Sequence, residues 1–203
     1  MQKLTFVIGA NAVGKTYFIE HHLANEKAVV LDVYDYQQKV YDEHGNKERI
    51  TFEEQFRCLK KANEKHFHDI INELKQGNDV IAEQTFFKAK RRIAYIDEIR
   101  KEMDVKIEVY VMHPSNERWI ENSKKREDIE NIEVYENQKK QMEFPNPAEG
   151  FDTIFEVIDD EIILRMDDIK PEIVKQARQE LTEEDTRIHR KDERKHNHRQ
   201  LIE

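Results

Sequence analysis

Short apolar runs along the chain alternate with longer stretches in which apolar residues recur at helical spacing. The runs are rich in β-branched residues, which is typical of buried strands, and they cover 4–8, 28–31, 79–82, 105–112 and 151–158. Helical spacing covers 16–24, 51–76, 88–99 and 117–143. This alternation predicts an α/β three-layer sandwich, in which a mostly parallel five-stranded sheet has helices on both faces. Residues 161–165 are a candidate for a return strand paired with the fifth.

Local signals mark several of the predicted helix ends. Thr51 and Glu54 form a capping-box pattern that opens the longest helix, and Gly77 ends it. The apolar stripe predicted for this helix consists of Phe52, Phe56, Leu59, Phe67, Ile70, Ile71 and Leu74. Residues 33–50 are polar and carry a turn signal at 44–46, so we expect a polar turn after the second strand. Ser115 is the predicted N-cap of the helix after the fourth strand.

The most specific motif lies between the first strand and the first helix. The segment Gly-Ala-Asn-Ala-Val-Gly-Lys-Thr matches the P-loop pattern G-x-x-x-x-G-K-[ST]. Its glycines let backbone N–H groups turn inward around phosphate oxygens, next to the positive end of a helix dipole. Lys15 is placed to reach the β- and γ-phosphates, and the Thr16 hydroxyl to ligate Mg²⁺. The predicted nucleotide-binding residues are Gly9, Ala10, Asn11, Ala12, Val13, Gly14, Lys15 and Thr16.

Acidic residues follow the second and third predicted strands. Because the carboxyl ends of parallel strands meet at one edge of a sheet, Asp32, Asp35 and Glu83 should converge on the P-loop. Phosphoryl transfer requires an acceptor for the proton of the attacking hydroxyl, and Asp35 is the predicted general base. Asp32 and Glu83 are predicted to hold Mg²⁺ through its water ligands, together with Thr16. The structural alternative is a polar turn at 32–35 and a polar cluster before the helix that follows Glu83.

Cations gather on two of the predicted helices. Lys125 and Arg126 belong to the charged stretch at about 114–143, which we interpret as a lid whose cations stabilise the transferring phosphoryl group. The strongest positive cluster comprises Lys88, Lys90, Arg91 and Arg92. It suits a phosphorylated or nucleic-acid substrate, and a solvated helix face is the alternative.

Charge and composition restrict the partners. Charged residues make up 38 % of the 203 residues and the net charge is -9, which disfavours a purely electrostatic nucleic-acid binder. The single cysteine, Cys58, excludes an internal disulfide and is expected to be an ordinary helical residue. No apolar run has the length needed to span a membrane, and the N-terminus lacks the apolar core of a signal peptide. We therefore expect a cytoplasmic protein without a membrane partner.

With these residues placed, the sequence resembles the small P-loop kinases related to the kinase domain of polynucleotide kinase, the AAA_33-type ATP-binding domain. The resemblance covers about 1–160 and rests on four blocks: Gly9–Thr16, Asp35–Gln37, Val80–Thr85, and the lid with Asn122 followed by Glu143–Asp152. It implies ATP as the phosphoryl donor, Asp35 as the general base and a cationic lid residue at the transition state.

The sequence also departs from that family pattern. The family often carries an arginine just before the lid asparagine, where this chain has Glu121, so Lys125 or Arg126 must supply the lid charge. Lysine is a point charge without the arginine fork, which predicts weaker clamping of the transition state. Glu83 replaces the more usual aspartate.

The predicted organisation is one kinase domain at 1–166 and a charged extension at 167–203, helical or disordered, through which a protein partner could bind. The predicted function is a Mg–ATP-dependent kinase that phosphorylates a hydroxyl of a small molecule, a nucleoside or a nucleic-acid 5′ end. One alternative is a zeta-toxin-like kinase of nucleotide sugars with an antitoxin-type partner. The other is an ATP-binding regulatory switch that does not transfer phosphate. The sequence leaves ATP or GTP, the acceptor and the oligomeric state open.

Overall fold

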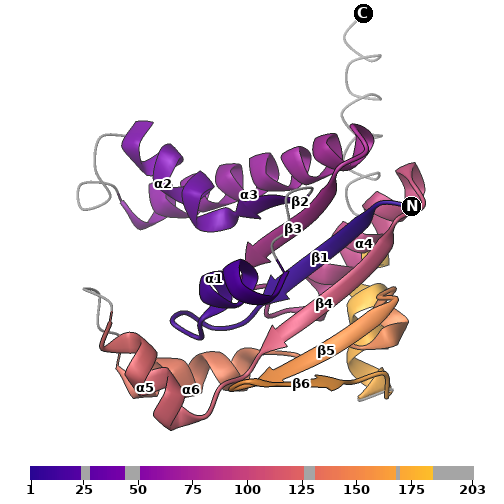
Figure 1. The fold of residues 1–203 in the computed structure, drawn as a ribbon. Helices are drawn as coiled ribbons and strands as arrows, with labels where there is room; N and C mark the ends of the chain where they lie inside the picture. The colour runs from indigo at the N-terminus through magenta and orange to yellow at the C-terminus, as the bar shows by residue number, and fades with distance from the viewer. Residues whose placement is uncertain (24–27, 44–50, 126–130, 168–169, 185–203) are drawn as a thin grey trace, which may run out of the picture.

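A single mixed sheet forms the centre of the molecule (Figure 1). The computed structural model describes residues 1–23, 28–43, 51–125, 131–167 and 170–184. The strands lie in the order β2-β3-β1-β4-β5-β6. They are β1 (Lys3–Ile8), β2 (Ala28–Asp32), β3 (Asp79–Gln84), β4 (Lys106–Met112), β5 (Thr153–Ile158) and β6 (Glu161–Leu164). The first five pair in parallel, and β6 returns antiparallel beside β5. The sheet therefore has six strands where five were expected, because the candidate return strand does form.

Helices cover both faces of the sheet and give the expected α/β three-layer sandwich. They are α1 (Lys15–Phe18) with its π-helical continuation η1 (Ile19–Leu23), α2 (Val33–Glu43), α3 (Phe52–Lys75), α4 (Ala89–Glu102), α5 (Asn116–Ser123), α6 (Ile132–Gln141), the 3₁₀ turn η3 (Pro147–Glu149) and a helix over 171–184. Helices α3 and α4 share one apolar core with Phe6, Val109 and Ile154 of the sheet. Helices α1, α5 and α6 share the core on the opposite face, around Val7 and Ile81.

The segment after β2 corrects one expectation. The chain continues into α2 over Val33–Glu43, where a polar turn was expected. Val33, Tyr36, Val40 and Tyr41 are buried at helical spacing, and the last three pack with Cys58 and Ala62 of α3. Most of the buried surface of α2 therefore lies against α3. The predicted turn at 44–46 lies outside the described residues.

Helix α3 begins and ends as predicted but buries a different stripe near its start. Thr51 and Glu54 form the capping box, and the helix stops before Gly77. Phe52 and Phe56 are 86 % and 65 % exposed, so their assignment to the core was wrong. A helix of 24 residues is about 36 Å long and the six residues of β3 span about 20 Å, so the first turns extend past the sheet.

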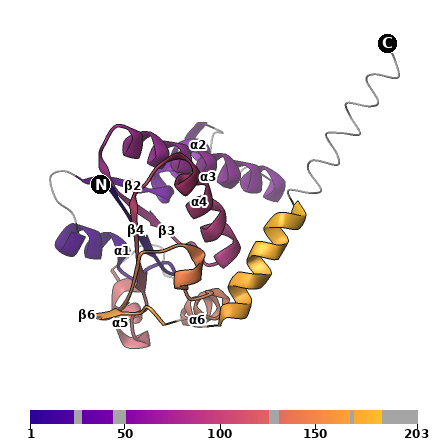
Figure 2. The same ribbon diagram turned by 90° about the vertical axis from the view of Figure 1, so that its right-hand side faces the viewer.

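The end of the described chain packs onto α4. The helix over 171–184 is the yellow helix in Figure 2. Its residues Val174 and Ala177 are buried against Ala89 and Ile93 of α4. Lys90 of α4 forms ion pairs with Glu180 and Glu184 of the helix over 171–184. The division between a kinase domain and an extension stays a prediction. Among the described residues, no helix combines the length and the apolar character needed to cross a membrane.

Candidate functional site

The P-loop follows β1 and leads directly into α1, as the motif requires. Gly9 has φ 153° and approaches β4 so closely that a Cβ there would stand 2.9 Å from the Met112 carbonyl oxygen. Gly14 has φ 88°, a left-handed conformation that favours glycine. Lys15 is buried, and its Nζ donates to the Ala10 carbonyl at 2.9 Å. The two glycines thus allow the tight loop, and the lysine ammonium lies against it.

Lid helices hold the P-loop through contacts that the sequence did not reveal. Trp119 of α5 donates from Nε1 to the Asn11 carbonyl at 2.9 Å, and Gln138 of α6 accepts from the Asn11 N–H at 3.0 Å. The Trp119 ring stacks on Tyr135 with centroids 4.9 Å apart. Trp119 was passed over because a lone tryptophan on a charged helix has no characteristic spacing. Its role is to fix the P-loop relative to the lid.

Glu83 and Thr16 meet at the carboxyl end of β3. The Thr16 hydroxyl donates to the Glu83 carboxylate, with Oγ1 lying 3.2 Å from Oε1 and 3.1 Å from Oε2. Burial raises the pKa of Glu83, the Lys15 ammonium opposes that rise, and the carboxylates of Asp32 and Asp35 add to it. Lys15, Asp32 and Asp35 therefore all lie within electrostatic reach of Glu83.

Asp32 and Asp35 occupy two different positions near Glu83. Asp32 ends β2 directly opposite Glu83 in the sheet register, and its Oδ1 accepts from the Tyr34 N–H at 2.9 Å. Burial raises the pKa of Asp32, the Tyr34 hydrogen bond lowers it, and repulsion by Asp35 raises it further. Asp35 is exposed in the first turn of α2, a helical position where a polar turn was expected. Asp32 thus caps the helix that carries Asp35.

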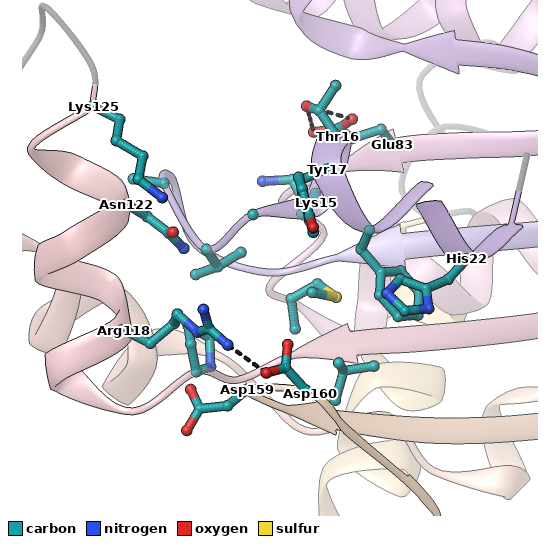
Figure 3. A pocket seen from close by; sticks show the side chains of 17 residues that line it. Lys15, Thr16, Tyr17, His22, Glu83, Arg118, Asn122, Lys125, Asp159 and Asp160 are labelled. Carbon is teal, nitrogen blue, oxygen red and sulfur yellow. Dashed lines mark hydrogen bonds and ion pairs between the residues drawn. The ribbon is translucent and has the colours of Figure 1, made fainter. Parts of the chain in front are cut away.

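A cavity of about 510 Å³ opens over the P-loop. Its lining joins the P-loop and Glu83 to α5 and to the turn between β5 and β6. Arg118, Asn122 and Lys125 face it from the lid (Figure 3). Lys125 thus lines the cavity, and its catalytic role stays a prediction, whereas Arg126 lies outside the described residues.

Arg118 is a further cation beside the cavity, and the sequence analysis did not select it. Its Nη2 lies 2.5 Å from Oδ2 of Asp160 in the β5–β6 turn, and both residues line the cavity (Figure 3). The spacing Arg118, Asn122 was the available signal, because residues four apart share one helix face. The family pattern points to the position directly before Asn122, where this chain has Glu121, and not to Arg118.

The basic cluster at the start of α4 is largely neutralised within the chain. Lys88 pairs with Glu143, and Lys90 with Glu180 and Glu184. Arg92 is fully buried, and its Nε lies 2.7 Å from the Glu149 carboxylate. Arg92 is therefore a structural residue, neither a substrate cation nor part of a solvated face.

Comparison with known protein families identifies the family of this chain. The family model of AAA_33, an AAA domain, matches residues 4–145. The chain belongs to the AAA_33 family. The match confirms the resemblance seen in the sequence and spans the P-loop, α2, β3, α4 and the lid helices. A comparison with curated proteins finds no match.

Solved structures share the AAA_33 chain's fold at low identity. A protein from Chloroflexus aurantiacus J-10-fl, provisionally described as a kinase, matches with a TM-score of 0.62 and 18 % identity over 90 % of this chain and 97 % of its own. A sugar kinase from Janibacter sp. HTCC2649 matches at 0.53 and 15 %, over 87 % and 92 %. A chain of the Pnkp1/Rnl/Hen1 RNA repair complex matches at 0.53 and 16 %, over 70 % of this chain and 44 % of that one. At these identities the likeness shows the fold.

The oxygen donors at Thr16 and Glu83 fit a magnesium ion. Mg²⁺ takes hard oxygen ligands and keeps several waters, so it needs only one or two protein side chains beside the phosphates. In the part of the chain that the structure describes, no group of three or more His, Cys, Asp or Glu could hold a metal alone. The donor set therefore suits a metal that binds together with nucleotide phosphates.

Proposed function

We propose that this AAA_33 protein is a Mg–ATP-dependent kinase that transfers the γ-phosphoryl group to a hydroxyl of a small molecule, a nucleoside or a nucleic-acid 5′ end. The observation that carries the proposal is that Lys15, Thr16 and Glu83 line one cavity at the carboxyl edge of the sheet, together with the cations Arg118 and Lys125. Asp35 lies within electrostatic reach of Glu83 at the same edge.

Each residue has a role that its position supports. The P-loop N–H groups and Lys15 bind the phosphates of the nucleotide. Thr16 and Glu83 would hold Mg²⁺, which bridges phosphate oxygens and neutralises their charge when bound. Asp35, exposed at the start of α2, accepts the proton of the attacking hydroxyl. Asp32 holds α2 through Tyr34 and so sets the position of Asp35.

The central experiment follows label from γ-labelled ATP, with Mg²⁺, to a 5′-hydroxyl oligonucleotide and to a pool of cell metabolites. Wild type should label an acceptor. Asp35→Asn should reduce the rate by about 10²- to 10⁴-fold, because the hydroxyl loses its proton acceptor. Lys15→Ala should abolish the transfer. Asp42→Asn is the matched control, since Asp42 is exposed two turns further along the same helix.

One outcome would contradict the proposal, and another would redirect it to a particular acceptor. Label released only as inorganic phosphate, at a rate unchanged in Asp35→Asn, would remove the general base and favour the regulatory switch. Growth arrest on expression, relieved by Asp35→Asn and accompanied by labelled nucleotide sugar, would instead identify the zeta-toxin-like alternative.

We further propose that the lid charge comes from Lys125 together with Arg118. Both line the cavity, and only Arg118 offers a guanidinium fork for two phosphate oxygens. Arg118→Gln should lower kcat by about 10²-fold, as expected for losing one donor to a developing charge, and Lys125→Gln should lower it less. Lys124→Gln is the matched control, because Lys124 is exposed on the adjacent position and does not line the cavity. Equal kcat in Arg118→Gln and wild type would leave Lys125 as the lid cation.

A further inference from the structure

Arg91 differs from the other cations at the start of α4. Lys88, Lys90 and Arg92 each form an ion pair with a carboxylate of this chain. Among the described residues, Arg91 forms no such pair. One hydrogen bond uses its guanidinium, from Nη2 to the Tyr95 hydroxyl at 3.4 Å. Since a guanidinium carries five N–H donors, most of the donors of Arg91 remain available to a ligand.

Aromatic rings hold the Arg91 guanidinium in place. It lies 5.5 Å from the ring centroid of Phe86 and 5.5 Å from that of Tyr95, and these two rings are 5.0 Å apart. Phe86 has φ 48°, a strained conformation for a bulky residue, and its carbonyl accepts from Arg92 Nη1 at 2.8 Å. The buried Arg92 thus fixes the loop that presents the Phe86 ring to Arg91.

Helix α3 connects Arg91 to the acids at the end of β2. The His66 Nε2–H donates to the Leu31 carbonyl at 3.0 Å, one residue before Asp32. Its ring contacts Tyr36, the residue after Asp35, with centroids 5.2 Å apart. Arg91 reaches this part of α3 through Tyr95, whose hydroxyl donates to the Asn63 carbonyl at 3.3 Å, about one turn before His66. Tyr95 and α3 therefore connect Arg91 to the segment that carries the acids.

From this arrangement we infer that Arg91 binds an anionic group, a phosphate or a carboxylate, on the acceptor whose hydroxyl faces Asp35. The inference rests on the proposed kinase function and names its substrate class. Asp32, Asp35 and Glu83 form a negative region that accepts a hydroxyl and repels an anion. A half-buried guanidinium nearby, oriented by two rings, matches two anionic oxygens at once. The acceptor would thus carry its hydroxyl and its charge at separate ends.

The test compares acceptors that differ in charge alone. D-gluconate is paired with D-glucitol, and a nucleoside 3′-phosphate with the same nucleoside, which also separates a carboxylate from a phosphate. Wild type should prefer the anionic member of one pair. Arg91→Gln should reduce that preference roughly 10- to 100-fold, the range for hydrogen bonds to a charged group, with KM for ATP unchanged. Arg91→Lys should retain part of it. Lys90→Gln, a neighbour bound to Glu180 and Glu184, should retain all of it.

A second readout separates charge recognition from a change in folding. Raising the salt concentration should weaken the anionic preference of wild type and leave Arg91→Gln unaffected, because only the charged pair is screened. Equal use of charged and neutral acceptors by wild type, or an unchanged preference in Arg91→Gln, would overturn the inference and leave the kinase standing.

Direct binding decides the case in which no acceptor is labelled, which would overturn the proposed kinase. Calorimetric binding of gluconate or the nucleoside 3′-phosphate to the protein with a non-hydrolysable ATP analogue, lost in Arg91→Gln, would still support the Arg91 site. Absence of such binding in wild type would overturn it.

Discussion

Two buried glutamates in this protein have opposite surroundings. Glu149, in η3, is completely buried, and its carboxylate accepts from Arg92 at 2.7 and 2.8 Å and from the Asn146 N–H at 3.1 Å. Glu83 is 6 % exposed, accepts from the Thr16 hydroxyl, and has the carboxylates of Asp32 and Asp35 close by. Both glutamates are buried, but Glu149 is paired with an arginine, whereas Glu83 lies among other acids.

The difference shows where the fold uses charge for structure and where it holds charge for a ligand. The Arg92–Glu149 pair joins α4 to the turn before β5, and Arg92 also fixes the Phe86 carbonyl. Burial raises the pKa of both Glu83 and Asp32, and repulsion among the neighbouring carboxylates adds to the rise against the opposing charge of Lys15, so their ionisation lowers the stability of the ligand-free protein. Under the proposed function, cations that arrive with a nucleotide would relieve this repulsion, which is the reason we assign the acid cluster to ligand binding and not to stability.

The largest expected effect comes from breaking the neutralised region. Arg92→Met should lower the free energy of unfolding by about 3–5 kcal/mol, because it leaves a buried carboxylate without its partner. Chemical denaturation measures the loss. The double variant Arg92→Met with Glu149→Leu should lose less than Arg92→Met alone, since no uncompensated charge remains.

The control for that prediction is Arg57→Gln. Arg57 pairs with Glu53 on the exposed surface of α3, so its loss should change stability by less than about 1 kcal/mol. Equal losses in Arg57→Gln and Arg92→Met would show that the buried pair contributes no more than a surface pair, and the comparison would fail.

The acid cluster should respond in the opposite direction. Glu83→Gln should remove phosphoryl transfer and raise the free energy of unfolding by about 0.5–2 kcal/mol, a gain typical of removing a strained functional group. The Gln amide oxygen still accepts from Thr16, so the change removes charge and keeps the hydrogen bond. Thermal unfolding beside the labelling assay measures both effects.

The pH dependence of that gain follows from the raised pKa of Glu83. The folded protein holds the Glu83 proton more tightly than the unfolded chain, so ionisation of Glu83 destabilises the fold. The gain from Glu83→Gln should be complete above the raised pKa, shrink as pH falls, and vanish below the ordinary value of 4.5. A gain independent of pH would show that the charge of Glu83 is not its cause.

Local residue patterns, namely apolar runs, helix caps and the P-loop motif, predicted most of the fold. Apolar runs located all the parallel strands, and caps at Thr51 and Ser115 set helix starts, because these patterns are local. The sequence analysis did not predict α2 because its apolar residues are few, and three of its four buried residues pack against α3. Phe52 and Phe56 were wrongly assigned to the core, because periodicity identifies one face of a helix but not how far the sheet extends beneath it.

Side-chain partners were the part that the sequence could not supply. The convergence of Asp32, Asp35 and Glu83 was predictable from strand ends alone, since the topology brings these ends together. The division of the basic cluster was not, because Arg92 meets Glu149 across 57 positions and Lys90 meets Glu184 across 94. Contacts at such separations depend on how whole elements pack.

The smallest expected effect concerns Lys90, which lies on the same helix as Arg92 but forms its ion pairs nearer the surface. The Lys90 Nζ lies 2.5 Å from Glu184 Oε1 and 3.5 Å from Glu180 Oε2, and the Lys90 side chain is 30 % exposed. Lys90→Gln should lower the free energy of unfolding by about 0.2–1 kcal/mol, because water screens the pair. The loss should disappear in 1 M salt, where screening extends to a few ångströms, whereas the loss in Arg92→Met should persist. A Lys90→Gln loss as large as that of Arg92→Met would mean that the helix over 171–184 holds α4 as strongly as the buried pair does.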